Sequence, residues 1–140
     1  MLGLGLALAL QGHPVGAQGE KDAEARFNAK ASVVSARVVY LTSQSYSGVT
    51  AKLLGEKNPG LRFLADGPST GPAVLSVKVL GPTQLRIAVY GSRTCWGIRE
   101  EGRQTGVATL YARHSGSPSD CKATSFKESD FLEHEGVWKY

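Results

Sequence analysis

The chain has 140 residues, which is enough for one domain with a modest hydrophobic core but too few for two. Hydrophobic residues make up 41% of it and charged residues 20%, a balance that excludes a disordered chain. The formal net charge of +4 is small for this length, and a solvated surface explains it more often than a nucleic-acid site does.

The first ten residues, MLGLGLALAL, carry no charge. A bilayer-spanning helix needs about 20 apolar residues, so this run is too short to span a membrane. A secretory signal would have a basic start, which is missing, although Val15-Gly16-Ala17 could be cut. We therefore expect residues 1–17 to form a separate hydrophobic segment, in which residues 1–10 are stable only when they are buried.

Residues 18–43 are predicted to form a long helix. Apolar residues recur there in steps of three or four positions, which places them on one face. We expect this face to pack on a sheet and Arg37 to be exposed. The predicted face comprises Ala23, Phe27, Ala31, Val34, Val38 and Leu41, and the core between helix and sheet is expected to contain Phe27, Val34, Val38 and Leu41.

A second, short helix is predicted after the polar stretch SQSYSGV. Thr50 is a good N-cap residue, and Asn58-Pro59 must end the helix because the residue before a proline disfavours helical geometry. Residues 65–72, ADGPSTGP, have the composition of a loop.

From residue 73 onward the apolar period changes to two, which indicates strands. Residues 73–80 and 85–91 are predicted to form a hairpin, and residues 94–100 and 107–113 form two further strands. A helix followed by a run of strands predicts an α+β fold, with a long N-terminal helix packed on an antiparallel sheet of about four strands. The strand residues expected to face the helix are Ala73, Leu75, Val77, Val79, Leu85, Ile87 and Val89.

The side chains with metal-binding or catalytic chemistry form no recognisable site. Cys95 and Cys121 are too far apart for a redox C-x-x-C motif, which leaves either a disulfide that closes a loop or two separate buried thiols. Asp120 with its neighbouring serines lacks the ligand spacing of a calcium loop. His13, His114 and His134 are scattered, and no nucleophile or phosphate-loop motif is present, so we expect no enzyme activity, no metal and no cofactor.

A nucleic-acid surface is the more serious alternative. Arginines and aromatic residues fall on or beside the predicted strands, a combination that suits backbone binding to DNA. Strand alternation, however, sets Trp96 opposite Arg99, so the two kinds of residue do not form one continuous face. The set comprises Arg86, Arg93, Arg99, Arg103 and Arg113, with Tyr90, Trp96 and Tyr111 between them.

The order of these elements resembles the type IV pilin and type II secretion pseudopilin superfamily. GEKDAEARFNAKASVVSARVVYLTSQSYSGVT is similar to the amphipathic half of a pilin spine helix and the turn that follows it. RTCWGIRE, with a later cysteine and with Trp138 near the end, resembles a pilin-like group of Gram-positive and related bacteria whose C-terminal end a disulfide closes. The resemblance covers residues 18–140, whereas the family's basic leader and its glutamate at the fifth mature position have no counterpart in MLGLG.

The resemblance implies a non-enzymatic subunit of an extracellular or periplasm-spanning filament, membrane-associated before assembly and then at the cell surface. Its partners would be identical or related subunits. Because such a body folds outside the cytoplasm, it also implies a Cys95–Cys121 disulfide. Two alternatives are a minor subunit that captures DNA and a secreted binding module released by cleavage near Ala17. The leucines expected to mediate assembly are Leu2, Leu4, Leu6, Leu8 and Leu10.

Overall fold

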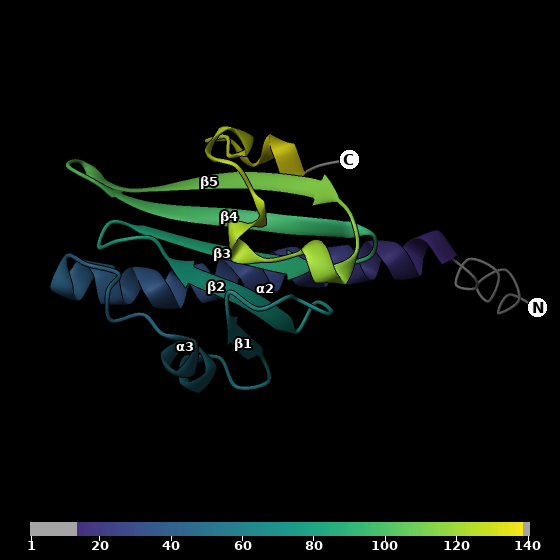
Figure 1. The fold of residues 1–140 in the computed structure, drawn as a ribbon, viewed down its shortest axis with the longest axis horizontal. Coiled ribbons are helices and arrows are strands. Elements are labelled where there is room, and N and C mark those ends of the chain that lie inside the picture. Colours follow the sequence, from purple (N-terminus) through teal and green to yellow (C-terminus); the bar gives the residue numbers. More distant parts are fainter. Residues whose placement is uncertain (1–13, 139–140) are drawn as a thin grey trace, which may run out of the picture.

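The computed structural model describes residues 14–138, which form one long helix packed on a five-stranded sheet (Figure 1). The five leucines predicted to mediate assembly lie outside the described residues. The helices are α2 (Pro14–Ser43) and α3 (Ala51–Lys57). The strands are β1 (Arg62–Ala65), β2 (Val74–Val79), β3 (Gln84–Tyr90), β4 (Thr94–Arg103) and β5 (Gly106–Ser115). Four short 3-10 turns follow, at Pro118–Asp120, Ala123–Ser125, Glu128–Asp130 and Glu135–Trp138.

The sheet has the strand order β1-β2-β3-β4-β5, and the predicted α+β architecture is confirmed. β2 to β5 are antiparallel neighbours and lie where the alternating pattern predicts strands. β1 pairs in parallel with β2 and is missing from the prediction. With four residues it is too short to show alternation, so the sequence alone does not distinguish it from a loop.

α3 begins and ends where the sequence predicts. The hydroxyl of Thr50 accepts a hydrogen bond from the backbone N–H of Leu53 at 3.1 Å, which satisfies one of the free donors at the helix start. Asn58, which precedes Pro59, is the C-cap.

The main core lies between α2 and one face of the sheet. Six of the seven strand residues predicted to face the helix are confirmed as part of it, with Leu75, Leu85 and Val89 completely buried. Ala73 is the exception, because it lies in the turn before β2 and is only partly buried. The helix contributes residues that we call the inner stripe: Ala25, Ala29, Val33, Ala36 and Tyr40, each at most 7% exposed.

The predicted core face of the helix is wrong. Phe27 is 70% exposed, Leu41 is 59% exposed, and Val34 and Val38 are each 55% exposed. α2 carries two apolar stripes with helical spacing, and the sheet takes the one with small side chains because the backbones approach closely. A Cβ on Gly91 would lie only 2.9 Å from the Cα atom of Asp22 on the helix.

The C-terminal segment covers the other face of the sheet. Phe126 and Phe131 are buried against Ala88, Leu110 and Ala112, which point away from α2. The segment then pairs with the β5 edge at Leu132, and Trp138 packs into the core beside Trp96. In Figure 1 this segment is drawn in yellow-green and yellow, beside β4 and β5.

Candidate assembly surface

The side of α2 that faces away from the sheet presents a continuous apolar stripe. We call it the outer stripe; it consists of Phe27, Ala31, Val34, Val38 and Leu41. Ala31 is partly buried and the other four are exposed. Single exposed apolar residues are ordinary on a protein surface, but several large ones in a row on one helix mark an interaction surface.

Asp22 fixes the start of the helix against the sheet. Its Oδ1 atom accepts hydrogen bonds from the indole Nε1–H of Trp96 at 2.9 Å and from the backbone N–H of Ser92 at 2.8 Å. Asp22 is 4% exposed and Trp96 is fully buried, so these bonds form in the protein interior. A Cβ on Gly91 would lie 2.1 Å from the same oxygen, which explains the glycine there.

A half-buried ion pair fixes the helix further along. Arg37, predicted to be exposed, is only partly so: its side chain is 37% exposed, because its guanidinium turns toward Glu100, whose side chain is fully buried. Nε and Nη2 of Arg37 donate to the Glu100 carboxylate at 2.7 and 3.1 Å, and the Thr109 hydroxyl donates to it at 2.5 Å. The hydrogen bond to Glu100 raises the pKa of the Arg37 guanidinium above its ordinary value. The rotation of α2, with the outer stripe outward, is therefore fixed by polar contacts as well as by packing.

A buried tyrosine lies beside this pair. Tyr46 is completely buried and stacks on Tyr40 with ring centroids 4.6 Å apart. Burial, reinforced by the negative charge of Glu100, raises the pKa of the Tyr46 hydroxyl well above its ordinary value. This hydroxyl makes no hydrogen bond within the described residues.

Cys95 and Cys121 form the disulfide implied by the resemblance. Their Cα atoms are 5.4 Å apart and both residues are fully buried. The backbone carbonyl of Cys121 accepts a hydrogen bond from the Ser69 N–H at 2.8 Å. The disulfide therefore joins the start of β4 to the C-terminal segment. The hydrogen bond from Ser69 in turn connects that segment to the loop before β2.

The arginines of the possible DNA surface do not form a free cationic face. Arg86 and Arg99 both pair with Glu128, and Arg103 pairs with Glu101 and Glu133. Trp96 is fully buried, so its ring is not available for base stacking. Arg93 and Arg113 are exposed, at the other end of the strands.

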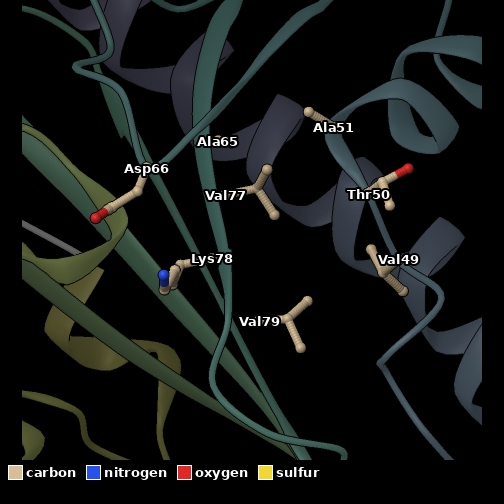
Figure 2. A pocket seen from close by; sticks show the side chains of 8 residues that line it. All are labelled: Val49, Thr50, Ala51, Ala65, Asp66, Val77, Lys78 and Val79. Carbon is tan, nitrogen blue, oxygen red and sulfur yellow. The ribbon is translucent and has the colours of Figure 1, made fainter.

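A pocket lies beside β2. The pocket, of about 290 Å³, is lined mainly by valines and alanines, and Figure 2 shows Val77 and Val79 on the side of β2 that faces Val49. Asp66 in its wall is bound to Thr124 at 2.9 Å. Among residues 14–138 no three His, Cys, Asp or Glu side chains gather as metal ligands.

The fold and the surface define an α+β domain whose N-terminal helix is anchored on one side and apolar on the other. Comparison with known proteins gives no matching family model, no matching curated protein and no matching solved structure. In the part of the chain that the structure describes, neither helix combines the length and apolarity needed to cross a bilayer.

Proposed function

We propose that this chain is a non-enzymatic structural subunit of an extracellular or periplasm-spanning filament, a type IV pilus or a pseudopilus. Copies of the chain would assemble through the outer stripe and through the hydrophobic segment at residues 1–10. The observation that carries the proposal is the outer stripe itself, because large apolar side chains point outward from a helix that polar contacts hold in place.

The stripe is large enough to contribute to association but not to sustain it. Complete burial of a large apolar side chain is worth roughly 1.5–3 kcal/mol, so its four exposed large residues contribute at most roughly 6–12 kcal/mol. Association costs about 4–15 kcal/mol in lost translational and rotational freedom. The stripe alone is therefore marginal, and the leucines of residues 1–10 would supply the remaining apolar area.

Both apolar surfaces come from the first 41 residues of the chain. The body that follows is closed by the inner stripe of α2 on one face of the sheet, and by a second core and the disulfide on the other. This division suits a subunit that uses one element to polymerise and the rest to form the surface of the polymer. The exposed polar residues of the body then face solvent.

The test is polymerisation of the full chain, followed by electron microscopy and sedimentation. We expect filaments from the full chain. Deletion of residues 1–10 should leave a folded, soluble, disulfide-bonded monomer, and a double substitution Phe27→Gln and Val34→Gln should strongly reduce filament yield. Leu132→Gln is a matched control, because Leu132 is exposed to a similar degree (44%) but lies at the β5 edge, outside the outer stripe.

Filaments from the truncated chain, or a full chain that is monodisperse and soluble without detergent, would contradict the proposal. The two alternatives give other results. A DNA-capturing subunit should bind DNA with a strong salt dependence. A secreted binding module should have a mature N-terminus near residue 18.

A further inference from the structure

The outer stripe has the spacing of a coiled-coil seam. Its five residues are separated by four, three, four and three positions, which is the alternation of a and d positions in a heptad repeat. Glu24 and Glu20 continue the same alternation toward the helix start and are both exposed. The seam thus consists of two carboxylates followed by five apolar residues.

The seam is open to a second helix. The residues that bury α2 against the sheet, the inner stripe, lie on the opposite side of the helix, and α2 contacts β3, β4 and α3. Because a seam of this spacing fits a partner with the same spacing, the α2 helix of a second copy is the simplest complement.

Charge favours a parallel arrangement of the two helices. Lys30 and Arg37 flank the seam on the same side, at the heptad position called g. In an antiparallel pair, g positions face each other, so Lys30 of one copy would approach Arg37 of the other. In a parallel pair the g position faces e, where α2 carries Lys21, Asn28, Ser35 and Thr42. Lys30 and Arg37 would face only the last three of these, and none of the three is charged.

Charge also disfavours a parallel pair in register. There, each a residue meets its own equivalent, so Glu24 would face Glu24 and the two carboxylates would repel. A displacement by one heptad, about 10 Å along the axis, removes this conflict. It inserts Glu24 between Phe27, Lys30, Ala31 and Val34 of the second copy, because an a residue fits into a hole formed by d, g, a and d residues.

We propose that Glu24 of one copy pairs with Lys30 of the next and sets a stagger of one heptad between parallel α2 helices. This inference rests on the proposed function, in which the outer stripe contacts another copy. Lys30 is accessible for this role: its side chain is 45% exposed, and its partner within the chain, Glu135, is 49% exposed. Glu24 has no ion pair among the described residues.

A staggered contact uses different residues on its two sides. Such a head-to-tail contact continues from copy to copy and builds a ring or an open helical polymer, whereas a contact in register would close as a dimer. The charge pair would therefore decide between an extended filament and a closed pair.

Charge reversal tests the pairing in the full chain. Glu24→Lys alone and Lys30→Glu alone should each lower filament yield by about tenfold or more, because each brings like charges together at the contact. The double variant should recover most of the wild-type yield. Glu135→Gln, which removes the partner of Lys30 within the chain, and Lys52→Glu on α3 are controls that should leave the yield unchanged. An intact disulfide and an unchanged melting temperature would show that each variant is folded.

Cross-linking tests the stagger without touching either charge. In the staggered arrangement Ala31 faces Val38 of the next copy, so a mixture of Ala31→Cys chains and Val38→Cys chains should form a disulfide between them. Ala31→Cys alone should not cross-link, because equivalent residues would be about 10 Å apart. Cross-linking of Ala31→Cys alone, or filaments insensitive to Glu24→Lys, would overturn the stagger while leaving the filament function intact. A wild-type chain that forms no filaments would instead overturn the proposed function.

Discussion

Replacing Asp22 by alanine should release the first turns of α2 from the sheet. The Oδ1 atom of Asp22 is the acceptor for two donors, the indole N–H of Trp96 and the backbone N–H of Ser92. Asp22 is 4% exposed and Trp96 is fully buried, so the alanine variant leaves donors that water reaches poorly.

The magnitude follows from the number of donors left without an acceptor. An unsatisfied buried donor costs about 1–3 kcal/mol, so we expect Asp22→Ala, which leaves two, to lower the free energy of unfolding by about 2–6 kcal/mol. Asp22→Asn is the matched variant, because its amide retains an Oδ1 atom that can accept both bonds. Bonds to a charged acceptor are stronger than bonds to a neutral one, so the asparagine variant should lose less, about 1–2 kcal/mol.

Urea unfolding followed by tryptophan fluorescence measures both values, since Trp96 reports directly on the site. A second variant, Gly91→Ala, approaches the same oxygen from the sheet and should also be destabilising, because its Cβ would lie 2.1 Å from Oδ1. If Asp22→Ala cost less than Asp22→Asn, or if neither changed stability, the argument that this carboxylate anchors the helix would be refuted.

Three further predictions concern the body. Cys95→Ser should lower stability by about 3–4 kcal/mol in the chain-entropy model and raise protease sensitivity near residues 114–124, and thiol counting should find no free thiol in the unreduced wild type. Tyr46→Phe should change stability by less than about 1 kcal/mol at neutral pH, because the lost hydroxyl has no hydrogen bond. Since the pKa of Tyr46 is raised above its ordinary value of 10.0, the unfolded chain ionises first, so wild-type stability should fall as pH rises above 10 and less so in Tyr46→Phe. The Arg103 and Arg99 guanidinium groups lower the pKa of Glu101 below its ordinary value of 4.5. The wild type should therefore be more stable than Glu101→Gln above pH 4.5, and this difference should vanish as the pH falls further and Glu101 is protonated. A stability difference that persisted in acid would contradict this.

The positions of the elements could be predicted from the sequence because they depend on local periodicity. The long helix, the capped helix after Thr50 and four of the five strands are where the patterns place them. The face of the helix could not be chosen in this way. Ala25, Ala29, Val33, Ala36 and Tyr40 repeat with a helical period just as the outer stripe does, and the larger side chains suggested the wrong one.

The polar contacts that orient the helix depend on residues far apart in the chain. Asp22 and Trp96 are 74 positions apart, and Arg37 and Glu100 are 63 apart, so no local pattern indicates either pair. One signal was available: Gly91, before β4, and Gly102, near its end, are typical of positions that another segment approaches closely. The disulfide was expected only from the resemblance, since the cysteine spacing left free thiols open.

The C-terminal segment has a further consequence for how copies of the chain can meet. An uncovered edge strand is a template onto which another chain can add by backbone hydrogen bonds, and this leads to aggregation. At the β5 edge, Tyr111 and Leu132 exchange two backbone hydrogen bonds, at 2.8 and 2.9 Å, so the middle of the edge is already occupied. At the opposite edge, β1 is only four residues long and α3 packs beside it. Uncontrolled growth of the sheet from chain to chain is thereby hindered at both edges, even where many copies are held close together.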